Sequence, residues 1–288
     1  MANYLDSAGL SYLWGKIENL NDWLPKTAAA HNSIYRGKDI TSKYTDGSLY
    51  TAISSGTFDD VFVGDYFTAT ISSTNWIING SEIVASGGAT LAPRIFRIME
   101  LDPLLYRGQN SLTTHHAAVM MDRAIAHAPM GGIASVSGGY VGSEFYIKCS
   151  QSITESLRTT FTKSNVNHLV SHQELLTNGA DDSGVITGWA WYIEYWTLPT
   201  EIQVYGSNIA NKPGEVGNTG IGYGQLSAFR LNPSLITTIR NDEGDTNSSW
   251  WLRNIVNGGS FAMVGYHGMA VSSSANVVRA VRPVFYID

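Results

Sequence analysis

The C-terminal end of the chain constrains the fold more than any other segment. Two short blocks have the pattern of strands with large side chains: WWLR at residues 250–253 and VRPVF at residues 281–285. Residues 254–280 between them keep an apolar spacing but mix side chains of every size and polarity. Catalysis needs particular groups at fixed positions, whereas recognition needs a rigid frame that carries varied side chains. The pattern therefore favours binding over catalysis, and we expect no enzymatic activity.

The segment divides into expected frame and expected surface. Small, apolar or turn-forming residues should build the frame: Phe261, Ala262, Val264, Gly268, Ala270, Ala275, Val281 and Pro283. The remaining residues share no polarity, size or shape and are the predicted ligand-binding set: Asn254, Met263, Gly265, Tyr266, His267, Met269, Val271, Ser272, Ser273, Ser274, Asn276, Val277 and Val278. An ordinary exposed loop has the same pattern, so these residues alone leave both interpretations open.

The composition fits a β-rich protein with recognition surfaces. Charged residues make up 15% of the 288, below the roughly 25% of a typical globular protein. The 29 Gly indicate many turns, and the 15 Tyr and 8 Trp supply amphipathic rings that give contact area at low entropic cost. The net charge is -6, without any Lys/Arg cluster. This argues against a nucleic-acid partner, since phosphate binding needs concentrated positive charge.

We find no sequence marker of export or membrane insertion. The N-terminus lacks the basic start and apolar core of a secretory signal. No apolar run reaches the roughly 18 residues that span a bilayer, because Glu194 interrupts the best candidate at 189–196. The lone Cys149 excludes an intrachain disulfide. We therefore expect synthesis in a reducing cytoplasm without a signal peptide.

Apolar spacing predicts one amphipathic helix at residues 6–24, followed by a connector at 26–50. The helix should bury its stripe either on the body of the protein or on sister chains. The stripe residues are Leu10, Leu13, Trp14, Ile17, Leu20 and Leu24.

From residue 51 onward the pattern is mostly β, so the expected fold class is α+β and β-rich. A capping box at Ser152–Glu155 predicts one further helix at 152–162, and periodicity leaves open whether residues 120–128 form a helix after the strand at 113–121. The predicted strands are 58–71, 76–84 (a hairpin around Asn79-Gly80), 94–101, 113–121, 187–195, 201–205, 224–230, 250–256, 260–264 and 277–287.

Candidate catalytic and metal sites are weak. His168 and His172 have the spacing of two metal ligands on one helix, but Leu169 stands where a zinc protease needs Glu, so structural roles are favoured. His115 and His116 should face opposite sides of a strand. Two acidic loops, residues 178–182 and 241–245, contain oxygen ligands for a structural calcium ion, although neither has EF-hand spacing. No nucleophile elbow, phosphate loop or dinucleotide fingerprint occurs, and no cofactor is expected.

The two C-terminal blocks resemble the signature of a protein family in bacteriophages and prophages of gut bacteria. Members of that family are similar to the formylglycine-enzyme version of the C-type lectin fold. The N-terminal residues 4–14 are similar to the start of phage tail and fibre proteins, so the resemblance covers essentially the whole chain. Further similar blocks lie at residues 34–39, 56–61, 63–66, 139–143, 172–176, 187–191 and 223–226.

The resemblance implies a fold and a function. Residues 1–40 would serve attachment and oligomerisation, and residues 41–288 would form a C-type-lectin-like domain with a variable segment at 254–278. The chain would be a phage receptor-binding protein on the virion tail, assembled with other tail proteins and with sister chains, as a trimer. Its ligand would be a host-surface glycan or protein, and a diversity-generating retroelement would vary the segment.

Two alternatives to the receptor-binding role remain. One is a structural tail or baseplate protein without a receptor, and the other is an enzyme that degrades surface polysaccharide. Formylglycine-generating activity is not implied, because that chemistry needs two nearby cysteines as copper ligands and the chain has only Cys149.

Overall fold

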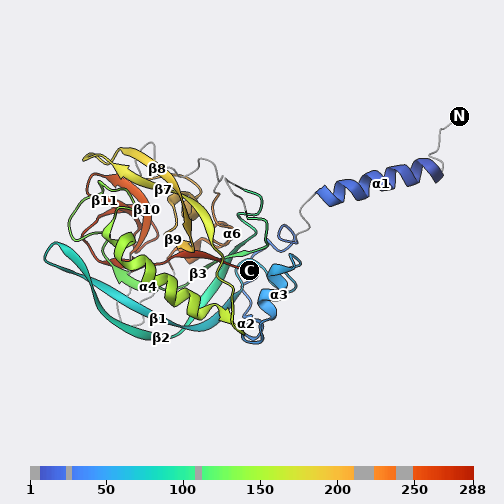
Figure 1. The fold of residues 1–288 in the computed structure, drawn as a ribbon, viewed down its shortest axis with the longest axis horizontal. Helices are drawn as coiled ribbons and strands as arrows, with labels where there is room; N and C mark the ends of the chain where they lie inside the picture. The colour runs from blue at the N-terminus through green and yellow to red at the C-terminus, as the bar shows by residue number, and fades with distance from the viewer. Residues whose placement is uncertain (1–6, 24–27, 108–111, 211–223, 238–248) are drawn as a thin grey trace.

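The computed structural model describes residues 7–23, 28–107, 112–210, 224–237 and 249–288. Figure 1 shows a curled, β-rich body and one helix, α1 (Ser7–Trp23), that lies apart from it. The predicted N-terminal helix is confirmed, and Leu10, Leu13 and Trp14 are exposed on it. The body therefore does not bury this part of the apolar stripe. None of the described helices is both long and apolar enough to cross a membrane.

The first sheet is antiparallel throughout and curls beneath the body (Figure 1). The hairpin predicted around Asn79-Gly80 is confirmed: Asn79 pairs with Glu82, and Gly80 has the positive φ that such a tight turn requires. In spatial order its strands are β1 (Tyr66–Asn79), β2 (Glu82–Leu101), β3 (Ala117–Met121), β14 (Val284–Ile287) and β9 (Trp196–Thr197).

The second sheet contains the C-terminal segment. Its neighbours are antiparallel except β10 and β13, which pair in parallel through Trp250 and Ala280. Val281 ends β13 here, whereas Val284 begins β14 of the first sheet, so Arg282 and Pro283 form the link between the sheets. In spatial order the strands are β12 (Ala270–Ser274), β11 (Ser260–Val264), β10 (Trp250–Asn257), β13 (Arg279–Val281) and β4 (Ala126–Ala128).

Smaller elements complete the body. A two-stranded sheet of β7 (His172–Ala180) and β8 (Ile186–Glu194) lies beside the second sheet, at the top of Figure 1. The other elements are the hairpin of β5 (Thr162–Lys163) and β6 (Val166–Asn167), the helices α2 (Thr41–Asp46), α3 (Ser48–Ser54), α4 (Glu144–Thr160), α5 (Glu201–Tyr205) and α6 (Ser227–Leu231), and the 3-10 helix η1 (Pro233–Ile236).

Helix α4 packs across β1 and begins earlier than its sequence suggests. Ser143 is the N-cap, and its hydroxyl accepts a hydrogen bond from the Tyr146 amide at 3.2 Å. Ser152 therefore lies inside the helix, and the capping box predicted there is wrong. The reason is the apolar face: Phe145 and Cys149 extend it by two turns and are fully buried.

Other predictions of secondary structure are wrong as well. Residues 201–205 form α5 rather than a strand, because Thr200 and Gln203 make a complete capping box. Residues 227–231 form α6, where a strand was predicted at 224–230. The predicted connector at 26–50 contains helix α2, which begins at Thr41. The helical alternative for residues 120–128 fails as well, since this stretch contains the end of β3 and all of β4. The coarse prediction of a β-rich α+β fold is confirmed.

Candidate binding surface

The two tryptophans at the start of β10 belong to the core. Adjacent strand residues point to opposite faces, and here both faces are covered: Trp250 is 1% exposed and Trp251 is fully buried. The Trp251 indole Nε1 donates to the carbonyl of Ala128 at 2.8 Å, and that of Trp250 donates to Ile236 at 3.2 Å. These rings tie β10 to β4 and η1, so they cannot contact a ligand.

Arg282 connects the two sheets through a buried side chain. Its Nε donates to the carbonyl of Met121 at 2.6 Å, and its Nη1 donates to that of Leu235 at 3.0 Å. The guanidinium lies 5.1 Å from the Trp250 ring centroid and 5.5 Å from that of Phe229. Burial lowers the pKa of Arg282 to about 10. The Arg-Pro block is thus part of the frame, as expected.

The turn between β11 and β12 has a fixed backbone. The Gly265 amide donates to Met269 O and the Gly268 amide donates to Gly265 O, both at 2.8 Å. Gly268 adopts a positive φ of 80°, which favours glycine. The Tyr205 hydroxyl donates to Gly268 O at 3.0 Å and fastens the turn to α5.

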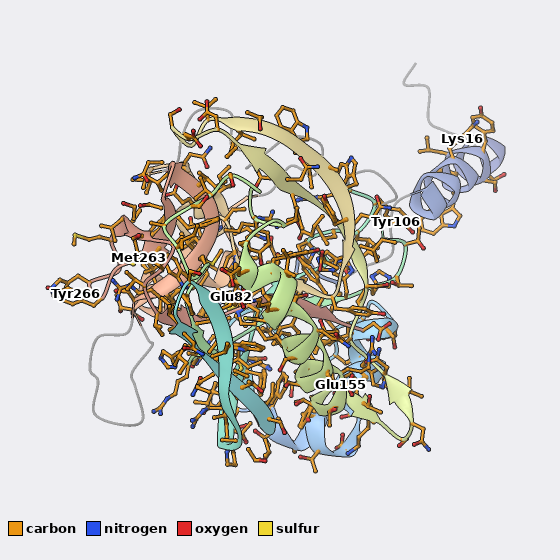
Figure 2. The ribbon with its side chains drawn as sticks, turned by 60° about the vertical axis from the view of Figure 1, so that its left-hand side comes forward. Lys16, Glu82, Tyr106, Glu155, Met263 and Tyr266 are labelled. Atoms are coloured by element: carbon orange, nitrogen blue, oxygen red, sulfur yellow. The ribbon has the colours of Figure 1, made fainter. Side chains whose placement is uncertain are left out.

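This turn, residues 265–269, presents large side chains to solvent. Tyr266 is 51% exposed and Met269 is 55% exposed, and His267 is exposed beside them. The rings of Tyr266 and His267 lie 3.9 Å apart between centroids. Figure 2 shows Tyr266 at the edge of the molecule, pointing away from the body, with Met263 nearer to it. We call these exposed residues of the turn the hairpin tip.

The predicted ligand-binding set separates into three groups. Tyr266, His267, Met269, Ser272, Asn276 and Val278 are exposed, whereas Met263, Val271, Ser274 and Val277 are half-buried. Asn254, Gly265 and Ser273 are buried, so their assignment to the surface is corrected. Asn254 Oδ1 accepts a hydrogen bond from the Glu201 amide at 2.8 Å, at the start of α5. Ser273 is buried in β12 opposite the fully buried Phe261.

A buried polar network lies behind this surface. Glu174 of β7 accepts from Arg253 Nη1 at 3.0 Å, and its other oxygen lies 3.2 Å from His172 Nε2. Glu194 of β8 accepts from the Tyr146 hydroxyl, and burial raises the pKa of its carboxyl group. All of these side chains are buried except Tyr146, which is half-buried. The network therefore connects β7, β8, β10 and α4 to one another and does not form a ligand site.

The two histidine pairs differ in whether their members share a partner. His168 stacks on Tyr50 at 3.7 Å between centroids, whereas His172 contacts Glu174, so the two rings have different partners. His115 and His116 lie in the loop before β3, and both approach Asp102; the prediction that they alternate across a strand is wrong. Burial lowers the pKa of His116 to about 4.

The acidic loops show no calcium-binding arrangement in the part that is described. Oδ1 of Asp181 accepts from the amides of Ser183 and Val185, both at 2.9 Å, so it stabilises its own turn. The loop at 241–245 lies outside the described residues. Across the described ranges, no three His, Cys, Asp or Glu side chains gather where they could hold a metal ion.

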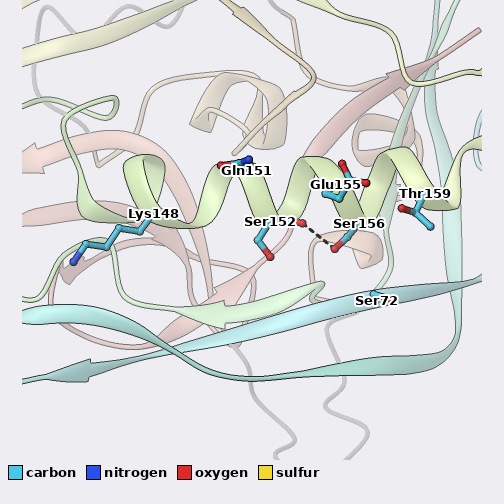
Figure 3. A pocket seen from close by; sticks show the side chains of 7 residues that line it. All are labelled: Ser72, Lys148, Gln151, Ser152, Glu155, Ser156 and Thr159. Atoms are coloured by element: carbon cyan, nitrogen blue, oxygen red, sulfur yellow. Dashed lines mark hydrogen bonds between the residues drawn. The ribbon is translucent and has the colours of Figure 1, made fainter.

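A shallow polar groove runs between α4 and β1 (Figure 3). It has a volume of about 550 Å³ and is lined by Ser72, Lys148, Gln151, Ser152, Glu155, Ser156 and Thr159. The Lys148 ammonium lies 2.9 Å from Glu144, and the Ser156 hydroxyl donates to the Ser152 carbonyl at 2.9 Å. The lining residues thus contain hydroxyls that serve the helix itself and no nucleophile hydrogen-bonded to a base.

In comparisons with known proteins, no protein-family model, curated protein or solved structure matches the chain.

Proposed function

We propose that the chain is a phage receptor-binding protein that binds a host-surface glycan or protein through the hairpin tip. The observation that carries this proposal is the contrast between frame and tip. Trp250, Trp251 and Arg282 are buried and hydrogen-bonded, whereas Tyr266 and Met269 are half-exposed on a fixed turn. Substitution at such exposed positions costs little stability. Rings held on a rigid turn also lose little entropy on binding.

In this proposal residues 41–288 form a C-type-lectin-like domain, and the segment at 254–278 is varied by a retroelement. The buried members of that segment, such as Asn254 and Ser273, would then stay constant. The protein acts on the virion tail without catalysis. The sequence resemblance and the β-rich fold support this assignment.

Helix α1 supplies the multivalency that weak single sites require. Leu10 and Leu13 are 55% and 47% exposed, so a stripe of this kind is available to sister chains or tail proteins. Association into a trimer would raise avidity without new contacts at the tip.

An adsorption competition tests the receptor-binding role. Purified wild-type protein should block phage adsorption to host cells, and Tyr266→Ala should block it much less. Tyr106→Ala is the matched control, because Tyr106 is 56% exposed and lies on the other side of the molecule from Tyr266 in Figure 2. If both variants block adsorption as well as wild type, the tip does not bind the receptor and the structural tail-protein role is favoured.

Deep sequencing of the gene in a replicating phage population tests the variation. Non-synonymous changes should gather at the exposed positions of 263–278 and spare Trp250, Trp251, Arg282 and Pro283. Variation spread evenly along the chain would contradict the retroelement.

A further inference from the structure

The hairpin of β7 and β8 has its charged side chains inside. Side chains alternate between the two faces of a strand, and one face of this hairpin carries His172, Glu174 and Glu194, each at most 7% exposed. These residues meet Arg253 and Tyr146 in the buried network described above. We call this the inner face. A hairpin on a core normally places apolar side chains inside and polar ones outside.

The opposite, outer face carries no charged side chain along its paired length. Ile193 is 72% exposed and Trp189 is 52% exposed, while Trp191 between them is half-buried. Ile193 is more exposed than any other large apolar side chain in the described ranges. The residues of this face pair directly across the hairpin: Gln173 with Ile193, Leu175 with Trp191 and Thr177 with Trp189.

The burial of the outer face is uneven. Leu175 and Thr177 are 8% and 3% exposed, so the exposed part belongs almost entirely to β8. Packing against Leu175, its partner across the hairpin, accounts for the half-buried Trp191. Packing does not account for Trp189 and Ile193, whose side chains are more than half exposed to solvent. This reversed pattern leaves an uncharged and partly apolar surface open to solvent.

The size and charge of the surface restrict that ligand. A tryptophan side chain has about 150–250 Å² of surface, so the exposed parts of Trp189, Trp191 and Ile193 together offer about 300 Å². A stable protein partner needs about 800 Å² on each side. The absence of charge on this face disfavours an anionic or cationic ligand. The run from Trp189 to Ile193 spans about 13 Å, the length of a short oligosaccharide.

We infer that the outer face of β7 and β8 is a second binding platform, which takes a neutral oligosaccharide. The apolar faces of the sugar rings pack on the Trp189 and Trp191 indoles and on Ile193. This inference is independent of the role proposed for the hairpin tip, because it names different residues.

Isothermal titration calorimetry on the full-length protein tests the inference. The probes are tetrasaccharides of glucose, mannose, galactose and N-acetylglucosamine. Wild type should bind at least one of them. Trp189→Ala should weaken that binding about tenfold, Ile193→Ala should weaken it less, and Trp189→Phe should retain most of it because the ring is kept. Circular dichroism confirms that each variant is folded; if Trp189→Ala unfolds, Ile193→Ala and Trp189→Phe carry the test.

Two control variants separate this platform from other surfaces. Ile147→Ala removes a 65% exposed isoleucine from α4 and should leave binding unchanged. Tyr266→Ala should also leave it unchanged; if Tyr266→Ala alone abolishes binding, the sugar binds the hairpin tip and the inference is overturned. Two more results overturn it: wild type that binds none of the tetrasaccharides, or a Trp189→Ala variant that changes only the oligomeric state in sedimentation.

Discussion

Replacing Trp251 tests the division between frame and hairpin tip most directly. Its side chain is fully buried and donates to the Ala128 carbonyl at 2.8 Å. Burial of about 150–250 Å² at about 25 cal/mol per Å² corresponds to about 4–6 kcal/mol, and the lost hydrogen bond adds about 1 kcal/mol. Trp251→Ala should therefore lower the free energy of unfolding by an amount comparable to the whole stability of many domains, about 5–15 kcal/mol.

A milder change keeps the protein folded enough to measure. Trp251→Phe retains most of the apolar contact but removes the hydrogen bond to the Ala128 carbonyl, and we expect a loss of about 2 kcal/mol in the free energy of unfolding. Tyr266→Ala, on the exposed tip, should cost less than about 0.5 kcal/mol.

Urea denaturation followed by far-UV circular dichroism measures both variants without depending on tryptophan fluorescence. The midpoint should fall clearly for Trp251→Phe and stay near wild type for Tyr266→Ala. Equal losses in the two variants would refute the reasoning, because the tip would then contribute to the fold as much as the frame does.

Four further predictions concern substitutions of single residues. Gly268→Ala should lower the free energy of unfolding by about 1–2 kcal/mol in the same urea assay, because φ is 80° and the added Cβ would approach a neighbouring methyl group to 2.7 Å. Burial raises the pKa of Glu100 to about 7, so between about pH 4.5 and 7 the folded state keeps a proton that the unfolded state releases. The free energy of unfolding should therefore fall as the pH rises through this range. Glu100→Gln should reduce this fall in thermal melts recorded across the same range. Arg253→Ala should cost about 3–5 kcal/mol because it leaves the Glu174 carboxylate buried without this ion pair, whereas a loss below about 1 kcal/mol would show that the pair is dispensable. Under the proposed oligomerisation through α1, Leu13→Glu should lower the oligomeric state in sedimentation without changing the melting temperature of the body.

The sequence identified those elements whose signals are local. The hairpin at Asn79-Gly80 and the strands β10 and β11 follow from turn residues and from blocks of large apolar side chains. The short helices α5 and α6 were missed because a stretch as short as EIQVY at 201–205 fits a strand and a helix alike. Its helical form depends on the cap from Thr200 and on the contact of the Glu201 amide with Asn254.

The same limit applies to the candidate surface. The expected frame residues Phe261, Ala262 and Val264 are fully buried, and Tyr266 and Met269 of the predicted surface set are exposed. Asn254 and Ser273 were assigned to the wrong group, because small polar side chains are stable in either setting and only their neighbours decide.

The sequence by itself determined the β-rich class, the N-terminal amphipathic helix and the hairpin at Asn79-Gly80, because periodicity and turn chemistry depend on residues that are adjacent in the chain. Only the tertiary structure decided which face of β7 and β8 lies inside. Glu174 and Glu194 are buried there because Arg253, far along the chain, and Tyr146 of α4 meet them. A buried carboxylate is tolerated only where such partners arrive, and their arrival depends on how distant segments pack.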